Sequence, residues 1–224
     1  MTSIGTAAPV VPGRLEQFST RVAFFITGFS ISAWAPLVPY AKSRLGLDDA
    51  SLGLLLLCLG IGSILSMPLA GAMTVRYGCR RIIVMVGSIA CLCLPLLATL
   101  TDVPLMVATL FVYGASMGAL GCVTNIQAII VERASGKTMM SGFHGLFSCG
   151  GILGAAGVSA LLSVGVWPWL TMTLVALFIG LALYKAGPNL LRYGSEAGGP
   201  AFAIPHGVVL FIGLMCFTVF LTEG

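Results

Sequence analysis

A histidine and a glutamate lie inside long apolar segments of this chain, where a proton could be taken up or released away from bulk water. His144 lies about two helical turns into such a segment, and an imidazole changes its charge near neutral pH. Glu223 is the one acid that falls inside an expected membrane-spanning helix. Because a carboxylate is costly in lipid, we interpret Glu223 as a proton carrier or an acceptor for hydroxyl groups. The alternatives are a hydrogen bond between helices for His144 and simple solvation for Glu223.

Uncharged polar side chains in the apolar segments could bind a solute. Thr27, Ser30 and Trp34 share one helix face by their i, i+3, i+7 spacing, which suits a small polar or sugar-like ligand. Hydrogen bonding between helices is the alternative for this face. Asn125 and Gln127 point to nearly opposite sides of their helix, so only one of them can face a central cavity. We expect Asn125 to be that residue, with helix packing as the alternative.

The composition requires a membrane environment for the elements that hold these side chains. Only 8% of the 224 residues are charged and 58% are apolar, with a mean hydropathy of +1.06. An average soluble domain carries roughly 25% charged residues, so a water-facing surface could not be covered. The composition excludes a soluble enzyme, a disordered chain and a nucleic-acid binder. We expect no cofactor and no metal, and we interpret the seven cysteines as small apolar filler.

The charge-free intervals predict an all-α integral membrane protein with seven spans. A helix needs about 20 apolar residues to cross the hydrocarbon core. One long interval is divided at the turn Gly165–Pro168. The intervals are Val22–Ala41, Ala50–Val75, Ile82–Thr101, Val103–Val131, Thr138–Tyr184 (two spans) and Ala197–Thr222.

The positive charges predict the orientation in the membrane. With a cytoplasmic N-terminus, nine Lys and Arg residues lie inside and two lie outside, and the opposite orientation would reverse that count. The nine are Arg14, Arg21, Arg76, Arg80, Arg81, Arg133, Lys137, Lys185 and Arg192, and the two are Lys42 and Arg44. We therefore expect a multi-pass protein of a cell (inner) membrane, with the N-terminus in the cytoplasm.

The spans divide the chain unevenly into four segments. Residues 1–20 form a polar cytoplasmic tail, and residues 21–184 contain a bundle of six transmembrane helices. Residues 185–202 are rich in Gly and Pro and are expected to be a cytoplasmic linker. Residues 203–224 hold the seventh transmembrane helix. A single helix after a linker is expected to be the start of a second bundle that this sequence lacks.

The loop between the second and third spans contains a recognisable motif. It resembles the signature loop G-x-x-x-D-R-x-G-R-R of the major facilitator superfamily, although Val75 stands where the family usually has Asp. Glycines permit close helix approach and a turn with positive φ, while arginines hold a loop at an anionic membrane surface. The first glycine is expected to serve the close approach and the second the turn. The matching positions, which we expect to form a cytoplasmic gating loop, are Gly71, Arg76, Gly78, Arg80 and Arg81.

A second stretch, from Asn125 through Glu132-Arg133 to His144 and Ser148, resembles the fucose-permease-like branch of bacterial permeases. The resemblance covers the first half, plus one helix, of a twelve-helix family. It implies secondary transport of a small solute by alternating access, often coupled to protons. This chain alone is then expected not to transport. The alternatives are an efflux transporter for amphipathic compounds and a seven-span receptor, which the cytoplasmic N-terminus opposes. An enzyme is not expected, because the sequence has no paired intramembrane acids and no H-E-x-x-H motif.

Overall fold

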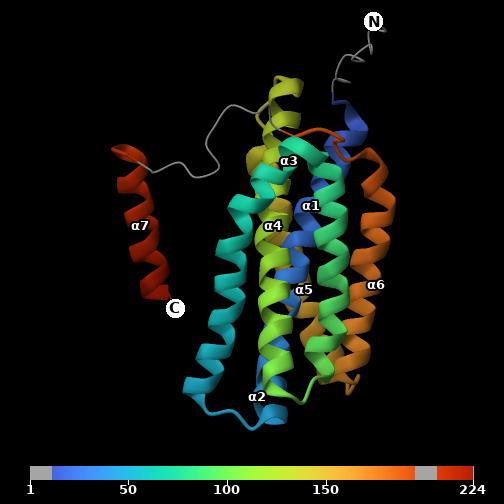
Figure 1. Ribbon diagram of the computed structural model, residues 1–224. Coiled ribbons are helices and arrows are strands. Elements are labelled where there is room, and N and C mark those ends of the chain that lie inside the picture. Colours follow the sequence, from blue (N-terminus) through green and yellow to red (C-terminus); the bar gives the residue numbers. More distant parts are fainter. Residues whose placement is uncertain (1–11, 195–205, 224) are drawn as a thin grey trace, which may run out of the picture.

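The computed structural model describes residues 12–194 and 206–223, and every regular element in these ranges is a helix. All of these helices except the last one pack side by side and form a bundle (Figure 1). The elements are α1 (Arg14–Ala33), the 3₁₀ turn η1 (Ala35–Leu37), α2 (Val38–Leu45), α3 (Asp49–Thr99), α4 (Val103–Ser135), α5 (Met140–Ser163), α6 (Pro168–Ala186), the 3₁₀ turn η2 (Gly187–Asn189) and α7 (Val208–Glu223).

Helix α3 contains two of the expected spans. Its 51 residues are interrupted at Gly78, whose backbone has φ 76° and ψ 161°. The two arms on either side of this residue run in opposite directions (Figure 1). Five helices of the described ranges are long and apolar enough to cross a membrane, and α3 has the length for two crossings. The bundle therefore has six crossings, and the positive φ expected at Gly78 is confirmed.

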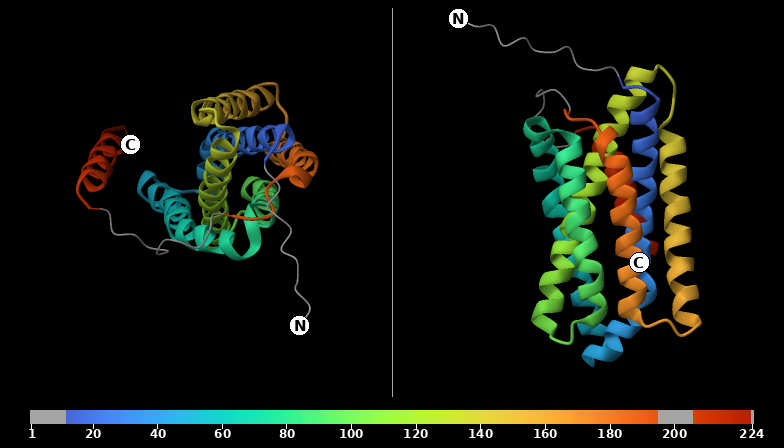
Figure 2. Two further views of the ribbon diagram at one scale, coloured as in Figure 1. Left: turned by 90° about the horizontal axis from the view of Figure 1, so that it is seen from above. Right: turned by 90° about the vertical axis from the view of Figure 1, so that its right-hand side faces the viewer.

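Helix α4 occupies the centre of the bundle. Seen along the helix axes, α1 and α5 lie on one side of α4 and the two arms of α3 on the other, with α6 beside α1 and the second arm of α3 (Figure 2). The outward faces are apolar: Leu92, Ile152 and Leu177 are 71%, 69% and 64% exposed. Such surfaces are compatible with lipid and not with water. The protein is thus an all-α integral membrane protein.

Glycines bring the helix backbones of the bundle into direct contact. A Cβ placed on Gly150 of α5 would lie 2.1 Å from the Phe25 carbonyl oxygen of α1. A Cβ on Gly114 of α4 would lie 2.0 Å from the Leu59 carbonyl oxygen of α3. Small residues thus allow α5 to approach α1, and α4 to approach α3, at backbone contact distance. The close helix approach expected at Gly71 is wrong, because a Cβ there would only reach ordinary contact with the Cys122 Sγ, at 3.8 Å.

The first span differs from its expected bounds at both ends. Helix α1 begins at Arg14, inside the segment expected to be a polar tail, because the Glu16 carboxylate accepts the Gly13 N–H at 2.7 Å and so caps the helix. At its other end the helix gives way to η1 and then to α2, each of which has a proline, Pro36 or Pro39, in its first turn.

Helix α7 has 16 residues and lies apart from α1–α6 (Figure 1). The start expected for it near Ala203 lies outside the described residues. Glu223 is the last residue of α7, and its side chain also lies outside the described part of the chain.

The turn between α4 and α5 is held by Glu132. Its Oε2 accepts the backbone N–H groups of Met139 and Met140, both at 2.6 Å, at the start of α5. This carboxylate satisfies two amides that the helix itself cannot, and it lies at the positive end of the helix dipole. Glu132 therefore joins the end of α4 to the start of α5.

The Glu132→Ala variant is expected to lower the free energy of unfolding by about 1–2 kcal/mol, because two amides lose a charged acceptor. Glu132→Gln keeps an acceptor oxygen and is expected to lose less. Thermal unfolding of the purified chain in detergent measures both. Equal stability of Glu132→Ala and the unaltered chain would contradict the capping role.

Candidate functional site

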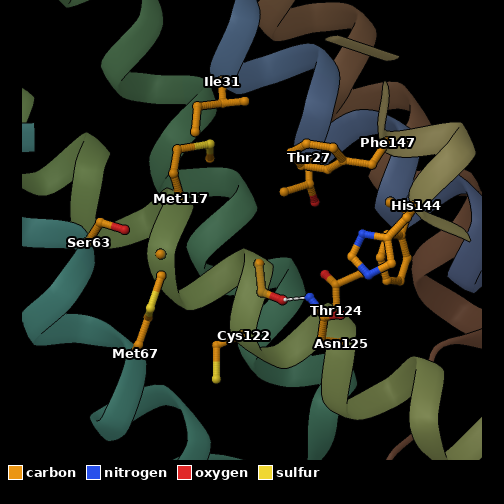
Figure 3. A pocket seen from close by; sticks show the side chains of 13 residues that line it. Thr27, Ile31, Ser63, Met67, Met117, Cys122, Thr124, Asn125, His144 and Phe147 are labelled. Carbon is orange, nitrogen blue, oxygen red and sulfur yellow. Dashed lines mark hydrogen bonds between the residues drawn. The ribbon is translucent and has the colours of Figure 1, made fainter. Parts of the chain in front are cut away.

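A cavity of about 470 Å³ lies between α1, the first arm of α3, α4 and α5. Figure 3 shows its side chains converging from these four helices. One part of the wall is polar and the rest is apolar and rich in sulfur and aromatic groups. The lining residues are Phe24, Thr27, Ile31, Ser63, Met67, Met117, Gly118, Gly121, Cys122, Thr124, Asn125, His144 and Phe147.

Three of the residues expected to bind solute or couple ions meet in this cavity: Thr27 from α1, Asn125 from α4 and His144 from α5. The Asn125 Nδ2 donates to the Gly121 carbonyl oxygen at 2.9 Å, and its Oδ1 has no hydrogen bond within the described ranges. The Thr27 hydroxyl donates to the Ala23 carbonyl at 2.7 Å and keeps its oxygen lone pairs for another donor. The polar part of the wall thus offers hydrogen-bond acceptors to a solute.

His144 presents its imidazole to the cavity (Figure 3). The ring meets Phe24 edge to face, with the ring centres 5.2 Å apart, and Phe24 stacks in turn on Phe143 at 5.3 Å. Neither imidazole nitrogen has a hydrogen bond to another described residue. The histidine is therefore oriented by aromatic contacts, and both of its nitrogens remain available to a solute, to water or to a proton.

Ser30 and Trp34, the other members of the expected polar face, do not line the cavity. Ser30 is buried against α4, where the Tyr113 hydroxyl donates to the Ser30 carbonyl oxygen at 2.6 Å and lies 3.2 Å from the Ser30 Oγ. Trp34 is also buried, and its Nε1 has no hydrogen-bond partner in the described structure. Ser30 therefore takes part in the helix contact that was the alternative for this face.

Several lining residues could not be selected from the sequence. Ser63, Met67 and Met117 resemble many other residues of the apolar spans, and only the packing of α3 on α4 turns them toward the cavity. The one available signal was the row of glycines in α4, since Gly118 and Gly121 lie on the same helix face as Asn125.

Gln127 lies on the other side of α4 from the cavity and is fully buried. Its Nε2 donates to the Thr20 Oγ1 of α1 at 2.9 Å, and its Oε1 accepts the Leu191 N–H at 3.3 Å. Gln127 thus connects α1, α4 and the segment after α6, whereas Asn125 faces the cavity.

The residues after α6 fold back over the bend of α3. The Cys79 N–H donates to the Tyr193 carbonyl at 3.2 Å and the Arg80 N–H to the Leu191 carbonyl at 2.7 Å. Leu191 is only 4% exposed, so this part of the expected linker is packed. The Gly-rich composition of residues 185–202 did not reveal the packing, because it depends on backbone groups more than 100 positions away. We name residues 190–194 the return segment.

Among the described residues, the arginines of the gating loop have no acidic partner. The Arg76 guanidinium lies 5.3 Å from the centre of the Tyr77 ring, and Val75 is 47% exposed. Within the described ranges the one ion pair joins Lys42 and Asp49, far from this loop in the sequence. No group of three His, Cys, Asp or Glu side chains that could hold a metal occurs in the described residues.

A bundle of lipid-facing helices around a cavity with a partly polar wall is compatible with a membrane transporter. Residues 22–222 match the model of the Major Facilitator Superfamily, and the chain therefore belongs to this family of transporters, which is not a family of enzymes.

Of three relatives, two are named as transporters and one as a membrane protein. An uncharacterised MFS-type transporter of Yersinia pestis is 54% identical over 216 residues, which are 96% of this chain and 56% of the relative. The uncharacterised transporter y4wD of Sinorhizobium fredii is 28% identical over 90% of this chain and 54% of its own length. The membrane protein MosC of Rhizobium meliloti is 28% identical over 95% of this chain and 53% of its own length. The chain thus spans just over half the length of these relatives.

Proposed function

We propose that the chain forms one half of the pathway of a secondary active transporter, a permease that moves a small polar solute by alternating access. The observation that carries the proposal is the cavity in which Thr27, Asn125 and His144 meet beside an apolar wall. A sugar-like solute suits this surface, because it has hydroxyl groups for the acceptors and an apolar face for the ring of Phe24 or Phe147. Transporters of this kind bind their solute near the midplane, between two bundles that rock against each other.

We propose proton symport as the driving reaction, with His144 as the residue that takes up the proton. An imidazole titrates near neutral pH, and this one faces the cavity without a hydrogen bond to another described side chain. Glu223 is the second candidate for the coupling residue. We further propose that the N-terminus is cytoplasmic, in a bacterial inner membrane, and that the protein is of the fucose-permease-like branch. The nine-to-two distribution of Lys and Arg supports the orientation.

A second candidate is efflux of amphipathic compounds, and the apolar wall of the cavity favours it. Met67 and Met117 are flexible and polarisable, and together with Phe147 they could adapt to apolar solutes of different shape. The two candidates differ in whether the polar acceptors or the apolar wall determine the affinity.

The test is a chimaera in which this chain is joined to the part of the Yersinia pestis relative that it does not cover. A panel of sugars, polyols and amphipathic cations is first screened on the whole relative in proteoliposomes with a pH gradient. We expect the chimaera to accumulate the same solute and this chain alone to accumulate none. No uptake of any panel member by the chimaera, where the whole relative is active, would contradict the proposal.

Two variants of the chimaera separate the candidate functions. Asn125→Ala and Thr27→Val are each expected to raise the half-saturating concentration of a polar solute about 2- to 10-fold, because one hydrogen bond is lost. Thr173→Val is the matched control, since the Thr173 hydroxyl on α6 donates to its own helix at 2.8 Å, as Thr27 does at 2.7 Å, but lies outside the cavity. Unchanged affinity in both cavity variants would favour efflux of an amphipathic compound.

A further inference from the structure

A second cavity, of about 450 Å³, lies on the other side of the bundle, between the second arm of α3 and the end of α6. Arg80 and Arg81 form one part of its wall, and Tyr184 lies beside them. The remaining wall is apolar and includes Val84, Met85 and Leu183. The cavity shares no residue with the candidate solute site, so the proposed transport function does not account for it.

The two guanidinium groups in this cavity have no negative partner in the described structure. The Arg80 Nη1 makes one long contact, 3.5 Å to the Pro188 carbonyl oxygen, and the Arg81 side chain has neither a hydrogen bond nor an ion pair to any described residue. Val75, five positions before Arg80 in the same loop, is uncharged. Two adjacent cations without a counter-charge favour binding of an anion that comes from outside the chain.

The apolar wall indicates what kind of anion fits. Met85 is 45% exposed on the second arm of α3, one turn further into the apolar span than Arg81, and so continues from the cations toward the bilayer core. Tyr184 is 76% exposed at the end of α6, in the position where aromatic residues lie among lipid head groups. A free phosphate would contact only the arginines, whereas a phospholipid would contact both the arginines and the apolar residues of the wall.

We propose that this cavity binds an anionic phospholipid. The guanidinium groups of Arg80 and Arg81 hold the phosphate of the head group, and one acyl chain lies along Met85 and Leu183. Arginine suits this role because its donors match phosphate oxygens in pairs. Basic pockets between transmembrane helices bind lipid head groups in this way. The lipid supplies the negative charge that the loop lacks and packs against both α3 and α6.

The experiment measures lipid retention by the purified chain in detergent, by native mass spectrometry, with added phosphatidylglycerol or phosphatidylcholine. We expect preferential retention of phosphatidylglycerol, and an affinity about 30-fold weaker in the double variant Arg80→Gln/Arg81→Gln. The single variant Arg81→Gln removes a side chain that has no hydrogen bond or ion pair to any described residue, and it is expected to weaken binding without affecting folding. The control is Arg133→Gln/Lys137→Gln, which removes the same charge where α4 meets α5, outside the cavity.

The outcomes separate the proposal from its alternatives. Retention of phosphatidylglycerol that falls equally in the cavity variants and in the control would mean unspecific attraction to surface charge and would overturn the proposal. Equal thermal stabilisation of the chain by glycerol phosphate and by phosphatidylglycerol at the same concentration would also overturn it, because the site would then bind a free anion. Stabilisation by phosphatidylglycerol alone, lost in Arg81→Gln, would support it.

Discussion

The Gly78→Ala variant is expected to lower the melting temperature of the detergent-solubilised chain by about 6–12 °C. Two effects add at this residue. Its φ of 76° and ψ of 161° belong to a backbone region that is essentially restricted to glycine, which costs about 1–3 kcal/mol for another residue. A Cβ would also lie 2.0 Å from the Arg192 carbonyl oxygen, so the return segment would have to move away from the bend of α3.

The control for this variant is Gly136→Ala. Gly136 also has a positive φ, 65°, but a Cβ there meets no atom within 4 Å. It is expected to show only the backbone cost, with a loss of about 2–4 °C. Equal losses in the two variants would mean that the contact with the return segment contributes nothing. Hydrogen exchange at the Arg80 amide, which donates to Leu191, should accelerate in Gly78→Ala and not in the control.

The second large effect is expected for Gly150→Val in α5. The new Cβ would lie 2.1 Å from the Phe25 carbonyl oxygen and 3.0 Å from its carbon. Both are backbone atoms of α1, so no side chain can rotate away and the two helices must separate. The expected loss is about 3 kcal/mol of unfolding free energy, at the upper end for overpacked cores. Thermal unfolding measures it.

Gly157→Val is the matched control on the same helix, because a Cβ at Gly157 meets nothing within 4 Å. It is expected to change the stability by less than about 1 kcal/mol, through helix propensity alone. In the chimaera, Gly150→Val should also abolish solute uptake, since α1 carries Thr27 and α5 carries His144, and both residues line the cavity. Uptake like that of the control would show that the spacing of α1 and α5 does not determine the site.

The crossings of the bundle could be predicted from the sequence because hydropathy and charge are local properties. The interval Ala50–Val75 and the first arm of α3 coincide, and Gly78 was identified as a turn with positive φ. The helix ends were less predictable. Helix α1 starts at Arg14 because of a capping contact between Glu16 and Gly13, which apolar periodicity does not report.

Only some of the residues that line the cavity could be predicted from the sequence. Thr27 and Ser30 are three positions apart and lie about 60° from each other around the helix, so the sequence assigns them to one face. In the structure Thr27 lines the cavity, and Ser30 is held by Tyr113 of α4. The packing of α4 against α1 decides which polar residues of α1 face the cavity and which face the other helix. This packing depends on both helices, so the sequence of α1 alone does not reveal it.

The sequence by itself determined the membrane environment, the crossings and the family, because these depend on the type and spacing of residues along one chain. The tertiary structure alone decided which polar residues meet, that Glu132 caps α5, and that Leu191 returns to Arg80. In each of these contacts, the way the helices pack determines which two groups meet. Helix packing also places Arg80 and Arg81 beside an apolar wall formed by α3 and α6. The sequence shows only that this loop is basic, whereas the packed structure adds the apolar surface on which we propose that a lipid binds.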